Sequence, residues 1–141
     1  MACFWLLGEL ENIMFKLKIL SILAILTLTG YSSQFGDVTD DVSGYFKSGD
    51  TKQLSTYFSS SISIALRDDE GVYSRVQAEI VLREFFNRNS PKDIKLLHRI
   101  DSNPNFRYVV LDLITDKGSY RLSYKMVSEA NKFKMTELRI E

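Results

Sequence analysis

Apolar and polar side chains alternate along most of the last fifty residues, in four stretches separated by short turn-prone segments. An alternation with a period of two is typical of β-strands that bury one face. Because each connection is only a few residues long, neighbouring strands are expected to run antiparallel, as a meander. The predicted strands are about Ile94–Asp101, Phe106–Thr115, Ser119–Ser128 and Phe133–Ile140.

The register of this meander divides its side chains into an apolar and a charged face, which a shift by one residue would mix. The last strand is the exception, because Leu138 and Ile140 fall on the charged face unless a β-bulge intervenes. The register pairs Asp101 with Phe106, Asp116 with Ser119 and Glu129 with Lys132. The predicted apolar face holds Ile94, Leu96, His98, Ile100, Val109, Leu111, Leu113, Tyr120, Leu122, Tyr124, Met126, Phe133, Met135, Glu137 and Arg139.

Three amphipathic helices are predicted upstream of the meander. The first follows Asp37, the second follows Asp50, and the longest covers Arg75–Asn87, where Ser74 and Gln77 have the spacing of a capping box. A short strand pair, 62–66 and 72–73, lies between the second and third helices. Helices that precede an antiparallel sheet indicate the α+β class.

Length and charge restrict the protein to a few broad classes. The chain has 141 residues and equal numbers of basic and acidic residues, 18 each. One domain is the expectation for this length. A dedicated nucleic-acid-binding protein would carry a basic excess, so no nucleic-acid partner is expected. Cys3 is the only cysteine, which excludes an intrachain disulfide.

The apolar run Leu17–Leu28 is too short, at 12 residues, to span a bilayer, which takes about 20. Lys16 and Lys18 lie just before and within the start of this run, and small or polar residues follow it, as in a secretory signal peptide. The acidic residues before Met14 do not fit that pattern. We therefore expect residues 1–13 to be an over-extended start, 14–32 a signal peptide, and 33–141 the mature domain, exported to the periplasm or outside the cell without a stable membrane anchor. A retained core helix or membrane anchor is the alternative.

The order of the predicted elements resembles that of the nuclear transport factor 2-like, or cystatin-like, superfamily. Two short helices joined by Gly49-Asp50 come first, followed by a strand pair, a long helix and an antiparallel sheet. The chain resembles the small secreted Gram-negative bacterial domains of unknown function in that superfamily. The resemblance covers about Asp37–Glu141. It implies a cone, in which a curved antiparallel sheet of four main strands plus a short hairpin wraps one long helix and two short helices precede them.

The resemblance does not select an activity, because the superfamily includes isomerases, dehydratases, transport adaptors and non-catalytic binding or dimerising domains. His98, the only histidine, and Glu137 both fall on the predicted apolar face. Either group could transfer a proton there. The alternatives are a core histidine bonded to a carbonyl, and a glutamate that pairs with Arg139 or is turned to solvent by a bulge. No catalytic residue, metal site or cofactor is predicted.

We therefore expect a non-catalytic domain that binds a small apolar or amphipathic ligand, or a partner protein, in the cone or at its rim. An isomerase-like or dehydratase-like enzyme that uses Glu137 or His98 is one alternative. A structural homodimer that pairs its outer sheet faces is another, although Arg99, Arg121, Lys125 and Lys134 would repel one another there. The candidate pocket-lining residues are Tyr57, His98, Leu111, Tyr124, Met126 and Glu137.

Overall fold

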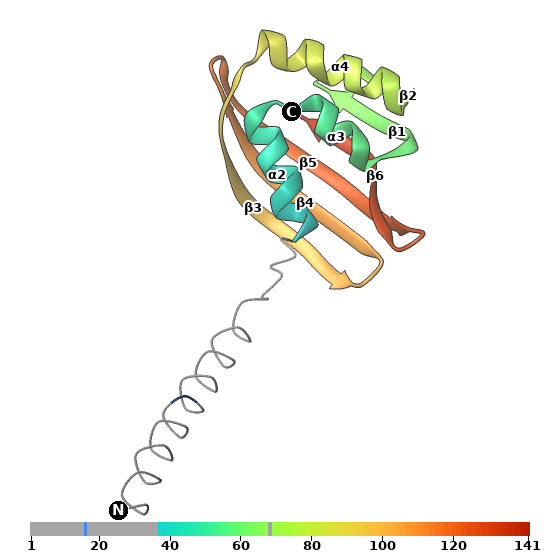
Figure 1. Ribbon diagram of the computed structural model, residues 1–141. Coiled ribbons are helices and arrows are strands. Elements are labelled where there is room, and N and C mark those ends of the chain that lie inside the picture. Colours follow the sequence, from blue (N-terminus) through green and yellow to red (C-terminus); the bar gives the residue numbers. More distant parts are fainter. Residues whose placement is uncertain (1–15, 17–36, 68) are drawn as a thin grey trace, which may run out of the picture. The chain divides into compact units, whose positions relative to one another are not determined.

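The computed structural model describes residue 16 and residues 37–67 and 69–141 (Figure 1). Apart from Lys16, the predicted start segment and signal peptide lie outside these residues. Within the described part of the chain, no helix is long and apolar enough to cross a membrane.

Three helices form where their capping residues predict them: α2 (Val38–Ser48), α3 (Thr51–Tyr57) and α4 (Arg75–Arg88). The Asp37 carboxylate accepts the Thr39 N–H at 3.2 Å and so caps α2. The cap of α3 is Asp50, which accepts the Gln53 N–H at 3.0 Å. Ser74 and Gln77 form the predicted capping box of α4.

The six strands form one curved sheet with the order β2-β1-β6-β5-β4-β3. Their bounds are Phe58–Leu66 (β1), Asp69–Ser74 (β2), Pro91–Asn103 (β3), Phe106–Thr115 (β4), Gly118–Glu129 (β5) and Lys132–Ile140 (β6). The four predicted meander strands are therefore present. Strand β1 is longer than predicted, because it begins at Phe58 and not at Ile62.

A parallel pairing joins the hairpin to the meander. Strand β1 runs parallel to β6, with Ile64 opposite Leu138 and Leu66 opposite Ile140. All other strand pairs are antiparallel. The hairpin and the meander are predicted separately from the sequence, and this contact joins them into one sheet.

The predicted register holds at the β5–β6 turn and over Ile94–Leu96 of the β3–β4 pair, but at the β3–β4 turn Phe106 pairs with Asn103 and not with Asp101 as predicted. Lys95 lies opposite Asp112 in β3 and β4, and Glu129 lies opposite Lys132 in β5 and β6, both as predicted. Between β4 and β5 the register is displaced by two residues, because a tight turn pairs Thr115 with Gly118. A shift of two leaves every side chain on its predicted face.

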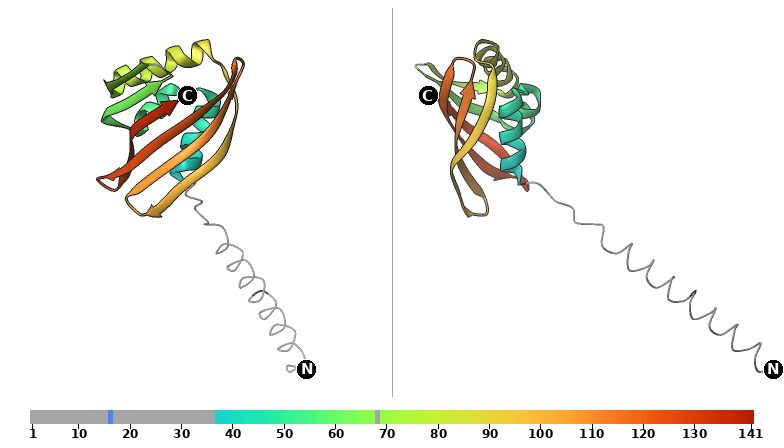
Figure 2. Two further views of the ribbon diagram at one scale, coloured as in Figure 1. Left: turned by 180° about the vertical axis from the view of Figure 1, so that it is seen from behind. Right: turned by 90° about the vertical axis from the view of Figure 1, so that its left-hand side faces the viewer.

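The helices pack on the concave side of the sheet. Figures 1 and 2 show α2 lying along the β3–β4 side and α4 lying beside β1 and β2. All three helices contribute to one core, with Phe46 of α2, Leu54 of α3 and Leu82 of α4 each 0% exposed. The concave face is therefore shared among three helices, and the sheet does not wrap α4 alone as predicted.

Candidate functional site

The middle of the concave face is filled by the core. Leu111, Tyr124 and Met126, three predicted pocket residues, are each 0% exposed. The ring of Phe46 from α2 lies 5.8 Å from the ring of Tyr124, and Phe86 from α4 lies 6.5 Å from Phe46. These three residues therefore act as core packing in this structure.

Tyr124 carries a buried polar atom into this core. Its Oη has no hydrogen-bond partner among the described residues. Burial raises the pKa of the Tyr124 phenol, and the negative charges of Asp37 and Asp40 add to the effect, whereas the nearby Ser43 hydroxyl and Arg99 oppose it. The phenol therefore stays protonated.

His98 differs from its predicted position because β3 contains a bulge at Leu97. The pairing shifts between Leu96 and His98, so that His98 lies opposite Val110 and Arg99 lies opposite Val109. Val109 belongs to the core, which puts Arg99 on the concave side and His98 on the other face. His98 is exposed there.

Glu137 is displaced in the same way by a bulge at Thr136 in β6. The pairing shifts between Lys125 and Met126, so that Glu137 faces Lys125 and Leu138 enters the core. The Glu137 carboxylate lies 3.7 Å from the Arg139 guanidinium and is 43% exposed. This bulge also explains why Leu138 and Ile140 are buried. The two groups of the predicted proton-transfer alternatives thus both lie off the concave face.

Tyr57 is half-buried and lines a hollow of about 460 Å³ between α2, α3 and the β5–β6 turn. We call it the Tyr57 hollow. Burial, together with Asp41, raises the pKa of the Tyr57 phenol. The wall of the Tyr57 hollow also contains Val38, Thr56, Asn131, Lys132, Phe133 and Lys134.

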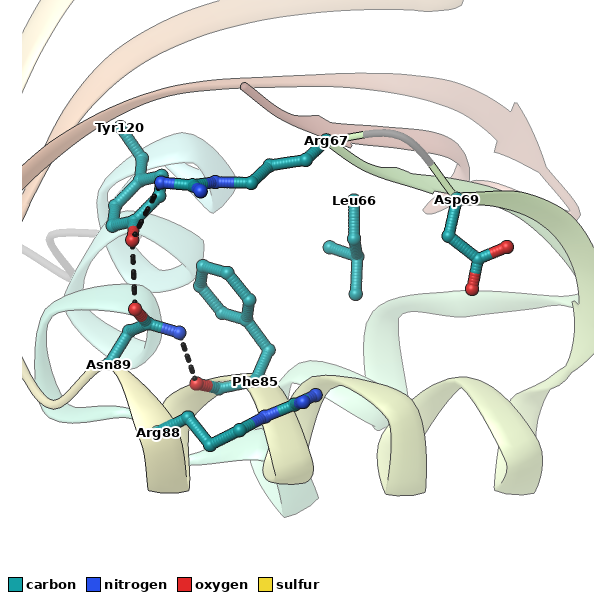
Figure 3. Close-up of a pocket in the computed structure, with 7 residues that line it drawn as sticks. All are labelled: Leu66, Arg67, Asp69, Phe85, Arg88, Asn89 and Tyr120. Atoms are coloured by element: carbon teal, nitrogen blue, oxygen red, sulfur yellow. Dashed lines mark hydrogen bonds between the residues drawn. The ribbon is translucent and has the colours of Figure 1, made fainter.

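A second hollow, of about 450 Å³, lies at the other end of the domain (Figure 3). It is bordered by the turn after β1, the C-terminal end of α4 and the beginning of β5. We call it the Arg67 hollow. Its lining consists of Leu66, Arg67, Asp69, Phe85, Arg88, Asn89 and Tyr120.

A chain of hydrogen bonds holds the Arg67 guanidinium on one wall of this hollow. Arg67 Nη2 donates to Tyr120 Oη at 3.2 Å, and Tyr120 Oη donates to Asn89 Oδ1 at 2.8 Å. Asn89 Nδ2 donates in turn to the Phe85 carbonyl at 3.0 Å. Figure 3 shows this chain running from the turn after β1, through Tyr120, to the end of α4. The guanidinium also lies 5.0 Å from the centre of the Tyr120 ring, a cation–π distance.

The Arg67 backbone is fixed as well as its side chain. Arg67 has φ of +54°, in the left-handed region that non-glycine residues seldom adopt. Its N–H donates to the Ile140 carbonyl at 2.8 Å, which ties the turn to β6. Backbone strain of this kind persists where the surroundings impose it and is frequent at binding sites.

Opposite charges lie on the two sides of an apolar strip in the Arg67 hollow. Figure 3 shows Leu66 and Phe85 in the middle, the Arg67 guanidinium on the Tyr120 side and the Asp69 carboxylate on the other. Arg88 adds a second guanidinium from α4. A positively charged hollow of this kind can hold an anionic group at a guanidinium while apolar atoms contact Leu66 and Phe85.

The Arg67 hollow is not predicted by any sequence pattern described above. From the sequence, Tyr120 is predicted only to lie on the apolar face of the sheet, and neither Arg67 nor Asn89 belongs to a recognisable motif. They meet because β1 pairs in parallel with β6, which brings the turn after β1 next to β5. Alternation along single strands carries no signal for that contact.

Among residues 37–67 and 69–141, no group of three His, Cys, Asp or Glu side chains is placed to hold a metal ion. The polar atoms of the Arg67 hollow are mostly donors, which suits an anion and not a cation.

Known structures share this fold at low sequence identity. Proteins of the DUF4783 family from Bacteroides ovatus and Bacteroides uniformis are both 21% identical to the chain, with TM-scores of 0.67 and 0.71. The alignments cover 70% and 74% of this chain and 89% and 96% of theirs. An NTF2-like protein of unknown function from Cytophaga hutchinsonii is 8% identical over 79% of this chain and 93% of its own, with a TM-score of 0.55.

The comparison with curated proteins gives no match. The family model of a domain of unknown function, DUF4783, matches residues 39–141, which is most of the chain. This match and the NTF2-like neighbours confirm the predicted resemblance to a superfamily domain of unknown function. The chain belongs to the DUF4783 family.

Proposed function

We propose that the domain binds a small amphipathic anion, such as an aliphatic carboxylate, in the Arg67 hollow at the rim of the sheet. The observation that carries this proposal is the fixed Arg67 guanidinium in a hollow that is also lined by Arg88 and by the apolar side chains of Leu66 and Phe85. A guanidinium binds a carboxylate through two parallel hydrogen bonds, and a side chain that is already ordered loses little entropy on binding.

The filled interior supports a site at the rim. Leu111, Tyr124 and Met126 contact other core residues where a ligand inside the cone would lie. His98 and Glu137, which an isomerase-like mechanism would use, face away from that interior. We therefore favour binding at the rim over proton transfer inside the cone.

We also propose that the domain works outside the cytoplasm, with residues 14–32 as its export signal. The support is the sequence pattern of lysines, a short apolar run and small residues. Cell fractionation of the full chain, with mass spectrometry of its N-terminus, tests this. A shortened chain in the exported fraction supports export, and a full-length chain confined to the cytoplasm contradicts it.

Calorimetric titration with octanoate tests the binding proposal. Octanol, which keeps the apolar tail without the charge, and acetate, which keeps the charge without the tail, are the comparison ligands. We expect octanoate to bind more tightly than either, because only octanoate uses both parts of the hollow. Equal affinity for octanol and octanoate would show that the arginines take no part.

A matched pair of variants on α4 isolates the charge. Arg88 lines the hollow, whereas Arg83 on the same helix pairs with Glu79 at 3.2 Å. Arg88→Gln should weaken octanoate binding by about fivefold or more, the equivalent of about 1 kcal/mol. Arg83→Gln should leave the affinity unchanged. The same loss in both variants would contradict the proposal.

A further inference from the structure

We infer that the Tyr57 hollow is a second, independent binding site, which takes a small aromatic anion. The two hollows have no lining residue in common. They also differ in chemistry, since guanidinium groups border the Arg67 hollow and ammonium groups border the Tyr57 hollow.

Aromatic side chains supply the wall of the Tyr57 hollow. Tyr57 and Phe133 are both half-buried, so each is packed on the domain and still borders the open space. The Arg107 guanidinium lies 4.7 Å from the centre of the Phe133 ring, a cation–π contact that helps to hold the ring in place. Tyr57 packs on Tyr45 with 6.1 Å between the ring centres. Rings fixed in this way favour stacking with a flat ligand.

Positive charge is in excess around this wall. Lys132 and Lys134 border the hollow, and the charge of Arg75 also acts on Lys134. The acidic groups nearby are Asp41, whose charge acts on Tyr57, and Glu129, which already accepts a hydrogen bond from Ser59 Oγ at 3.1 Å. Burial, followed by the charges of Arg75 and Lys132, lowers the pKa of the Lys134 ammonium. An anion beside Lys134 would relieve this repulsion.

The charge of Arg107, in contrast, is already balanced. Its guanidinium lies 3.6 Å from the Asp37 carboxylate and 3.8 Å from that of Asp101. Arg107 therefore supports the Phe133 ring without competing with the lysines for the ligand. The excess charge is confined to the lysine side of the hollow.

Lys134 is held at the edge of the hollow by the end of α3. Its Nζ donates to the Thr56 carbonyl at 2.6 Å, which uses one of three ammonium protons and leaves two for a ligand. Asn131, in the left-handed conformation at φ of +62°, sets the tight β5–β6 turn that places Lys132 on the same wall. The aromatic rings and the two lysines thus border the same hollow.

Fluorescence titration with 2-naphthoate tests this inference, with 2-naphthylmethanol as the neutral ligand of matched size. The full domain is used, and circular dichroism checks the fold of each variant. Lys134→Gln should weaken naphthoate binding by about fivefold or more. Lys117→Gln, at the exposed β4–β5 turn, is the matched lysine control and should bind like the wild type. Phe133→Leu keeps an apolar residue and should also weaken binding, because stacking is lost.

The Arg88→Gln variant makes the two sites distinguishable. Naphthoate binding that persists in Arg88→Gln and falls in Lys134→Gln supports the second site. Naphthoate binding that falls in Arg88→Gln and not in Lys134→Gln would overturn it and would assign the ligand to the Arg67 hollow. Equal binding of 2-naphthylmethanol and naphthoate, or an unchanged affinity in Lys134→Gln, would overturn it as well.

Discussion

The Arg99 guanidinium donates a hydrogen bond of 2.6 Å to the Asp37 carboxylate and so ties the edge strand β3 to the first turn of α2. The bulge at Leu97 makes this contact possible, because it turns Arg99 to the concave side and His98 away from it. Asp37 thus serves both as helix cap and as ion-pair partner.

Replacement of Asp37 should separate these two roles. Asp37→Ala removes the cap and the ion pair and should lower the free energy of unfolding by about 1–2 kcal/mol. Asp37→Asn keeps a good capping side chain and should cost less, about 0.5 kcal/mol. Urea denaturation measures both, with Asp40→Asn in the exposed first turn of α2 as control. An Asp37→Ala protein as stable as the wild type would contradict the described contacts.

Two glycines of the α2 region should respond to alanine in opposite directions. Gly49 ends α2 with φ of +69°, so that Gly49→Ala should destabilise the domain by about 1 kcal/mol. Gly44 lies inside α2, where an added Cβ meets nothing within 4 Å. Gly44→Ala should therefore stabilise by about 0.5–1 kcal/mol. Thermal unfolding of the two variants checks the pair, and a shift of both melting temperatures in the same direction would contradict this assignment.

The buried Tyr124 phenol should make stability fall in alkali. Its folded-state pKa is raised above the ordinary value of 10.0, so that the folded protein retains a proton that the unfolded chain releases as the pH passes 10. The free energy of unfolding should then decrease by up to about 1.4 kcal/mol per pH unit from this group. Below pH 10 the full contribution of the Tyr124 phenol to the free energy of unfolding is retained.

Tyr124→Phe should reduce that pH dependence. The substitution removes a buried hydroxyl that has no partner among the described residues, so we expect stability at pH 7 within about 1 kcal/mol of the wild type or above it. Urea unfolding from pH 8 to pH 11 measures the two proteins side by side. Parallel curves for the two proteins would show that Tyr124 is not the group responsible.

The local elements of this fold follow from local signals. The caps at Asp37, Asp50 and Ser74 mark the three helices, and alternation marks the meander strands. The face of most sheet residues is also predictable, because a register error of two between β4 and β5 leaves the faces unchanged. The family resemblance was predictable because it depends on the order of these helices and strands.

The candidate site depends on features that single-strand patterns do not encode. A bulge adds one residue and reverses the alternation after it, which moved His98 and Glu137 off the concave face. The bulge in β6 is indicated by the sequence, because Leu138 and Ile140 would otherwise fall on the charged face. The alternation in β3 shows no comparable break, so the bulge in β3 is not indicated. The parallel contact of β1 with β6, which builds the Arg67 hollow, joins residues about seventy positions apart.

Arg67 allows a test that separates its side chain from its backbone. Arg67→Asn removes the guanidinium but keeps a residue that tolerates the left-handed conformation. We expect octanoate affinity to fall by about fivefold or more, with stability changed by less than about 1 kcal/mol. Calorimetry and urea denaturation measure these two quantities, and unchanged affinity in a folded variant would exclude Arg67 from the site.

The most direct test of the proposed rim site is a titration of the ¹⁵N-labelled domain with octanoate, followed by two-dimensional ¹H–¹⁵N NMR. We expect the largest amide shifts at residues 66, 67, 69, 85–89 and 119–121, around the Arg67 hollow. Shifts concentrated instead at core strand positions such as Leu111, Tyr124 and Met126 would place the ligand on the concave face of the sheet and contradict binding at the rim.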